Sequence, residues 1–237
     1  DFTSFEMLDF TKAVVEEAKA ADPEASVLVV LGGPGLAYFG GGPGDETINA
    51  DSTFNYSTYD YLNEMLDTGI RPDAVGIQLY NGATLPAIDL GTVSDLLDLY
   101  GKDFNLPFYI EELEYPTHED YPGLANRSSF WGWHQGHTDR AQADWATGMF
   151  TLAFSKSYIS GANWSLSTDI PADRVEDGRA GDGYMHRDGL TPRPMAYALR
   201  DLFQSWKVSG TTQSGTDGQI QFDGFSGEYL LTLTAPN

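Results

Sequence analysis

The 237-residue sequence contains no cysteine, so neither disulfide bonds nor thiolate metal sites are available to it. It is also poor in basic residues: 13 lysines and arginines stand against 35 aspartates and glutamates, a formal charge of −22. Such a charge repels nucleic-acid phosphates and anionic lipid surfaces. No apolar run approaches the roughly 18–20 residues that a membrane-spanning helix needs. We therefore expect no nucleic-acid partner and no membrane partner.

The acidic residues are spread along the chain and do not form a tail. This distribution favours a solvated acidic surface, as in proteins from marine or salt-rich environments, and it suits a neutral or cationic partner. No signal peptide is recognisable, and the chain starts at Asp1 in the middle of a pattern, as a processed or partial chain would.

Helical and extended patterns alternate along the first 207 residues. Thr3 and Glu6 form a capping-box pattern ahead of an amphipathic helix that ends at Asp22-Pro23. The apolar run 26–31 shows no alternation, which is typical of a strand buried on both faces of a parallel sheet. Further helices are expected at 59–66, 93–100, 141–155 and 194–206, and further strands at 74–79, 107–113 and 158–166.

Four strands separated by helices indicate right-handed βαβ units and a parallel sheet. Because four open strands would expose two edges and an apolar face, we interpret the chain as an α/β fold, the C-terminal half (about strands 5–8) of a TIM (β/α)8 barrel. A small flavodoxin-like sheet is the alternative, and the very long loops after the strands argue against it. Residues 208–237 alternate in polarity and predict a β-strand tail packed on the barrel domain 1–207.

The stretch FYIEELE at 108–114 places acidic residues at the end of an apolar strand, where burial is costly unless they are paired or functional. Regular alternation predicts that Phe108, Ile110 and Glu112 share one face and that Glu111 points to the helix layer. In a TIM barrel the carboxyl ends of the strands carry the active site. The alternative is that these glutamates are surface charges on a strand-end turn.

Several segments, in order, resemble glycoside hydrolase family 10, the clan A xylanases. PFYIEELE resembles the strand 7 pattern, GIRPDAVGIQL at 69–79 the approach to strand 6, GANW at 161–164 strand 8, and GLTPRPMAYALRDLF at 189–203 the closing segment. The resemblance implies a retaining endo-β-1,4-xylanase-like hydrolase with Glu112 as nucleophile and no cofactor or metal. A register slip of one residue would make Glu111 the nucleophile instead.

The resemblance also implies contacts to a polysaccharide or oligosaccharide substrate. Trp164 takes the place of the strand 8 platform tryptophan, and Tyr80 or Asn81 stands where the family usually offers a histidine to the nucleophile. The acid/base of the family lies on strand 4 in an Asn-Glu-Pro pattern, which this chain lacks. It is therefore expected in a missing N-terminal half-barrel, on an upstream segment or a separate chain, of a secreted enzyme. The alternative is a non-catalytic carbohydrate-binding or structural protein that keeps the fold.

The loop 129–140 is rich in aromatic and imidazole side chains. Tryptophans stack on the apolar faces of sugar rings while histidines bind hydroxyls, so we expect substrate contacts from Trp131, Trp133, His134 and His137. The alternative is that these rings pack the loop onto the barrel. A metal is not expected, because the two histidines have no nearby third ligand in the sequence.

Overall fold

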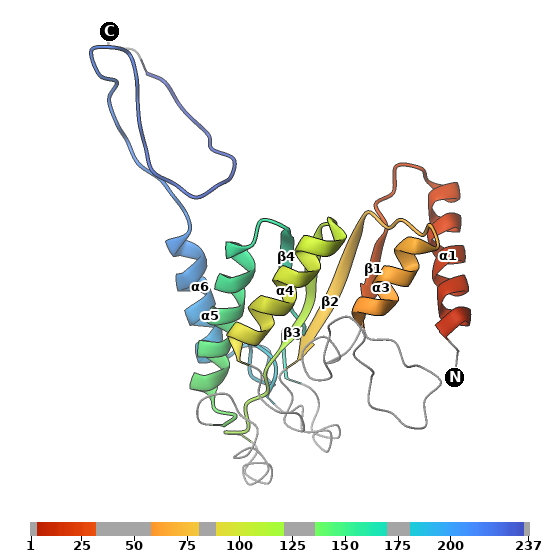
Figure 1. Cartoon of the computed structure of the whole chain (residues 1–237). Coiled ribbons are helices and arrows are strands. Elements are labelled where there is room, and N and C mark those ends of the chain that lie inside the picture. The colour runs from red at the N-terminus through yellow and green to blue at the C-terminus, as the bar shows by residue number, and fades with distance from the viewer. Residues whose placement is uncertain (1–3, 32–57, 81–88, 121–135, 170–180, 235–237) are drawn as a thin grey trace.

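The computed structural model describes residues 4–31, 58–80, 89–120, 136–169 and 181–234 (Figure 1). Helices and strands alternate along these residues, as the sequence predicts. Their order is α1 (Ser4–Ala21), β1 (Leu28–Leu31), α3 (Thr58–Asp67), β2 (Ala74–Tyr80), α4 (Leu90–Phe104), β3 (Phe108–Glu114), α5 (Asp139–Ser155), β4 (Ile159–Trp164) and α6 (Pro194–Ser205). None of the described helices combines the length and apolar character that crossing a membrane requires.

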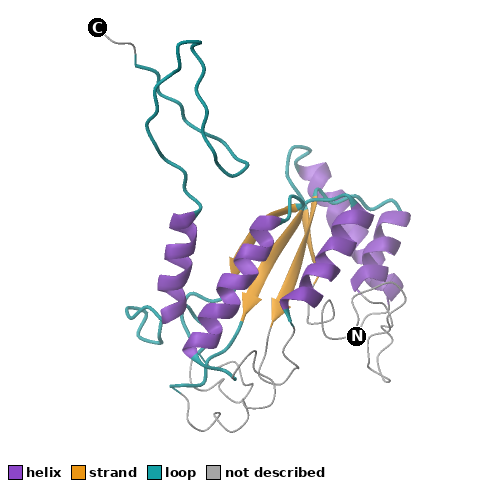
Figure 2. Ribbon diagram, turned by 60° about the vertical axis from the view of Figure 1, so that its left-hand side comes forward, coloured by secondary structure: helices purple, strands orange, loops and turns teal. Residues whose placement is uncertain are grey.

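The four strands form one parallel sheet in the order β1-β2-β3-β4 (Figure 2). Each helix returns the chain so that the next strand lies beside the previous one and runs the same way, as βαβ units do. The carboxyl ends of all four strands therefore meet at one edge, and α4, α5 and α6 begin near that edge (Figure 1).

One face of the sheet is covered by helices and holds the core. Its strand residues Val75, Ile77, Phe108, Ile110 and Leu113 are at most 1% exposed, and they join one cluster with helix residues that include Leu62, Met65, Leu97, Tyr100, Trp145 and Met149. The other face is open. On β1, Leu28 and Val30 are 37% and 46% exposed, which is high for apolar strand side chains.

The tail differs from its prediction. Residues 207–234 carry no strand, and every one of their side chains is exposed. Their alternating apolar residues pair with none of the described strands, and an unpaired amphipathic segment has no ladder to hold it extended. The Phe225 ring contacts the Phe154 ring of α5, with centroids 5.2 Å apart. The domain boundary at residue 208 stays a prediction.

Candidate active site

A β-bulge interrupts β3 where its acidic residues begin. Ile77 of β2 pairs with Ile110, but the next residue, Gln78, pairs with Glu112, so that Glu111 is an extra residue on β3. The register with β4 also shifts in this stretch, between Ile110 and Leu113. Bulges of this kind bend a strand and change the direction of its side chains, and they are frequent next to active sites.

The bulge separates Glu112 from the residues with which alternation grouped it. Regular alternation would place it with Phe108 and Ile110, but both of those side chains are 0% exposed and face the helices. Glu112 instead lies in register with Gln78, is half-buried, and accepts a hydrogen bond at Oε2 from the hydroxyl of Tyr80. The sequence offered Tyr80 or Asn81 as this donor. Tyr80, the last residue of β2, makes the bond, and Asn81 lies outside the described residues.

Glu111 lies on the open face too, and not toward the helix layer as alternation predicted. A Cβ atom placed on Gly76 would be 2.6 Å from Glu111 Cγ and 3.0 Å from Val30 Cγ2. Since Val30 is one of the exposed residues of the open face, Glu111 shares that face. The bulge thus presents two consecutive carboxylates on the same side of the sheet, with Glu112 closer to the strand end.

Trp164 ends β4, the strand that pairs with β3. It pairs in register with Leu113, the residue after Glu112, and its ring meets the Trp145 ring of α5 edge-on at 6.0 Å. Its Nε1 donates a hydrogen bond of 2.7 Å to the carbonyl oxygen of Asp182. The indole is half-buried and leans toward α5. Its contact with a sugar stays a prediction.

His137 lies inside the fold. Its ring is stacked on His118 at 4.8 Å, its Nδ1 is 2.8 Å from the carbonyl oxygen of Pro116, and the residue is 3% exposed. Because a carbonyl only accepts, Nδ1 carries the proton. Burial lowers the pKa of His137 to about 4, against a smaller opposing effect of the Pro116 bond. Its sugar contact stays a prediction, and the burial favours the packing alternative. Trp131, Trp133 and His134 lie outside the described residues.

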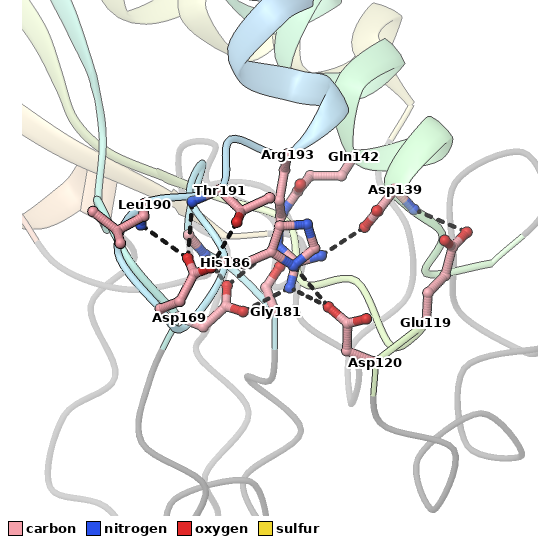
Figure 3. Close-up of polar contacts among 12 residues, drawn as sticks. Glu119, Asp120, Asp139, Gln142, Asp169, Gly181, His186, Leu190, Thr191 and Arg193 are labelled. Carbon is pink, nitrogen blue, oxygen red and sulfur yellow. Dashed lines mark hydrogen bonds and ion pairs between the residues drawn. The ribbon is translucent and has the colours of Figure 1, made fainter.

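An ion-pair cluster around Arg193 was not predicted (Figure 3). The Arg193 side chain is 0% exposed and precedes α6, and its guanidinium lies among Asp120, Asp139 and Asp169 at 3.0, 2.8 and 2.6 Å. The three carboxylates come from the segment after β3, the first turn of α5 and the segment after β4. In the sequence this arginine is only one residue of the closing segment 189–203. Its aspartate partners are 24 to 73 residues away, so no local pattern predicts the cluster.

The same cluster holds three residues with metal-ligand chemistry. The ligand atoms of Asp120, Asp169 and His186 lie within 4.8 Å of one another, beside an open cavity of about 510 Å³. However, Arg193 already bonds both carboxylates, and His186 Nδ1 is 3.0 Å from Asp120 Oδ2. The guanidinium supplies the positive charge that a metal would bring, so we assign the cluster a cross-linking role.

A parallel sheet with helices on one face and carboxylates at its carboxyl edge is the arrangement of TIM-barrel enzymes. No protein-family model and no curated protein matches this chain. Its fold, however, matches solved glycoside hydrolases, so the predicted fold class, part of a TIM barrel, is confirmed.

Two xylanases and a glucuronidase illustrate the match. Xylanase 10B from Thermotoga maritima has a TM-score of 0.56 and 17% identity, over 83% of this chain and 52% of that one. Xylanase 10B from Thermotoga petrophila, solved with xylobiose, has a TM-score of 0.54 and 18% identity over the same shares. A β-glucuronidase from Bifidobacterium dentium has a TM-score of 0.54 and 18% identity, over 86% of this chain and 28% of that one. The chain spans about half the length of these xylanases, and at these identities the likeness shows the fold alone.

Proposed function

We propose that this chain is the nucleophile-bearing part of a retaining glycoside hydrolase that cleaves β-glycosidic bonds in a polysaccharide, with an endo-β-1,4-xylanase-like activity. One observation carries the proposal. The Glu112 carboxylate lies on the open face at the carboxyl edge of the sheet, held there by a bulge and by the Tyr80 hydroxyl. The fold likeness to xylanases supports the same reading, and one of them is solved with xylobiose.

In this mechanism Glu112 attacks the anomeric carbon of the sugar. The glycosidic carbon–oxygen bond breaks while a second carboxylic acid gives its proton to the leaving oxygen. Water then attacks the same carbon, the second carboxylate takes a proton from that water, and Glu112 leaves as a carboxylate. Tyr80 fixes the orientation of the Glu112 carboxylate during both steps.

The second carboxyl group belongs about 5–5.5 Å from Glu112 in a retaining enzyme. Glu111 lies on the same strand as Glu112, further from the strand end and beside Gly76 and Val30. It is therefore poorly placed to act on a sugar from the side opposite Glu112. We therefore place the acid/base on an N-terminal half-barrel. That half is an upstream segment or a separate chain.

The open surfaces of the sheet fit such a half-barrel. Among the described residues β1 pairs only with β2 and β4 only with β3, which leaves the outer edge of each strand without a partner. The open face carries the exposed side chains of Leu28 and Val30. Residues of β4 also line an apolar groove of about 260 Å³, together with Phe154, Phe203 and Trp206. Four further parallel strands would pair with both outer edges, cover the open face and close the barrel.

The polysaccharide would lie across the carboxyl edge of the strands. We propose Trp164, Asn81, Trp131, Trp133 and His134 as its contact residues in addition to Tyr80. A polymer of this kind is met outside the cell, so we also propose that the protein is extracellular, where its charge of −22 keeps it soluble.

A mechanism-based label tests the nucleophile. The full-length protein that contains this chain is incubated with a 2-fluoro-β-xylobioside carrying a good leaving group, digested, and its labelled peptide sequenced by mass spectrometry. We expect the label on Glu112. A label on Glu111 would support the register slip and contradict the assignment.

Two variants serve as a matched pair. Glu112→Gln should lower kcat by several orders of magnitude, because the covalent step is lost, whereas Glu111→Gln should leave most of the activity. If the wild-type protein binds xylo-oligosaccharides but releases no reducing ends and takes no label, the protein is a carbohydrate-binding module and the enzymatic proposal fails.

A further inference from the structure

Hydrogen bonds form a continuous route from Arg193 to the indole of Trp164. Arg193 holds both carboxylate oxygens of Asp169, at 2.6 Å from Nη2 and 3.3 Å from Nε. Asp169 Oδ1 in turn accepts the backbone N–H of Gly183 at 3.2 Å. The residue before Gly183 is Asp182, whose carbonyl oxygen accepts the Trp164 Nε1–H at 2.7 Å. Every bonded group on this route other than the indole belongs to a buried residue.

The segment 181–183 in the middle of this route is tightly fitted. Gly181 has φ +71°, and a Cβ atom there would be 2.2 Å from the Thr117 carbonyl oxygen. At Gly183 a Cβ atom would be 2.4 Å from the carbonyl carbon of Thr168. The side-chain amide of Gln142 also donates to the Gly181 carbonyl oxygen at 2.8 Å. Since backbone packs closely against backbone at both glycines, a shift of Asp169 should displace the Asp182–Gly183 peptide, whose carbonyl oxygen accepts the Trp164 Nε1–H.

Arg193 makes contacts at this position that a lysine could not reproduce. The guanidinium presents a planar fork that holds a carboxylate at two points, which the single ammonium of lysine does not. Asp169 is nearly as buried as Arg193, with side chains 1% and 0% exposed, so solvent does not replace a lost bond. Asp139 binds the same guanidinium at 2.8 Å but makes no bond toward segment 181–183 among the described residues.

We propose that Arg193 is a positioning residue for Trp164: through Asp169 and segment 181–183 it fixes the orientation of the indole at the carboxyl end of β4. The consequence for sugar binding rests on the proposed function. The effect of Arg193 on the orientation of the indole does not rest on the proposed function, because it depends only on contacts within this chain.

Nuclear magnetic resonance of the indole N–H group tests the route directly. Five tryptophans give five indole signals, and Trp164→Phe identifies the one of interest. Arg193→Lys and Asp169→Asn should both shift or broaden that signal, because each weakens the fork while keeping the size of a side chain. Asp139→Asn is the matched control: it weakens a bond of similar length to the same guanidinium, and it should leave the Trp164 signal in place. An unchanged signal in Asp169→Asn, or an equal shift in Asp139→Asn, overturns the proposal.

Xylohexaose binding and turnover of the full-length protein give the second readout. Asp169→Asn, Arg193→Lys and Trp164→Ala should each raise KM by about tenfold, with a much smaller change in kcat, because Glu112 and Tyr80 are not on the route. Thermal unfolding of each variant confirms that it is folded. A loss of kcat with unchanged KM contradicts the proposal. If the wild-type protein neither binds nor cleaves xylohexaose, the proposed function fails, and the indole signal still decides the link between Arg193 and Trp164.

Discussion

The buried ring of His137 makes the stability of this protein depend on pH. Burial holds the folded-state pKa of His137 at about 4, below the ordinary value of 6.5. Above pH 6.5 both the folded and the unfolded chain carry a neutral ring, so its stabilisation is fully present. As the pH falls from 6.5 toward 4, the unfolded chain takes up a proton that the folded chain does not, and the folded state loses stability.

The size of this loss follows from the two pKa values. Each pKa unit corresponds to 1.36 kcal/mol, so the range from 6.5 to about 4 amounts to about 3 kcal/mol. Domains of this size are stable by about 5–15 kcal/mol, so one ring accounts for a large fraction of the total. His137→Phe keeps the packing on His118 and removes the titration. It also leaves the Pro116 carbonyl without its hydrogen bond, at a cost of about 1–2 kcal/mol at every pH.

Urea unfolding of the wild-type chain and of His137→Phe, followed by circular dichroism from pH 7.5 to pH 4, measures the difference. At pH 7.5 the wild-type chain should be the more stable of the two, and near pH 4 the order should reverse. The many carboxylates contribute to both proteins alike, so they cancel in the difference. Parallel stability curves for the two proteins would refute the buried neutral ring, as would a titration midpoint of the His137 ring near 6.5.

Three further changes are predicted to alter the free energy of unfolding, each measured by urea titration. Asp89→Ala should cost about 1 kcal/mol, because the Asp89 carboxylate caps α4 by accepting the Thr92 N–H at 2.8 Å; Asp89→Asn should cost far less, and an equal loss in both would contradict the capping role. Leu97→Ala should cost about 2–5 kcal/mol, because its side chain is 0% exposed in the core; a cost below 1 kcal/mol would mean that the helix does not pack there. Gly183→Ala should cost about 1–3 kcal/mol, since its Cβ atom would be 2.4 Å from the Thr168 carbonyl carbon; a neutral result would show that segment 181–183 yields easily.

The elements of the fold were predictable because each depends on neighbours in sequence. Short apolar runs such as 26–31 and 74–79 predicted parallel strands, and periodic apolar residues predicted the helices between them, but the predicted burial of 26–31 on both faces was wrong, because Leu28 and Val30 are exposed on the open face. The tail failed under the same logic. Its alternation is a real pattern, but a strand needs a partner edge, and local sequence does not tell whether one is present.

The residues of the candidate site were predictable from the sequence, but the faces on which they lie were not. The acidic strand end drew attention to Glu112 and, with Tyr80 named as a donor, to the hydrogen bond that the structure contains. Alternation then gave the wrong face for Glu111 and wrongly grouped Glu112 with Phe108 and Ile110, because one extra residue on β3 shifts the pattern. The bulge is defined by pairing with β2, about thirty residues earlier, so no reading of β3 alone reveals it.

By itself, the sequence determined which segments are helices and strands, that they alternate, and that carboxylates end the third strand. It determined also, through the lack of cysteine, that no disulfide bond holds this chain together. Only the tertiary structure decided where those carboxylates point and that Arg193 gathers three aspartates from three separate segments. The physical reason is range: helix and strand preferences act over a few residues, whereas register and buried ion pairs exist only after distant segments have packed together.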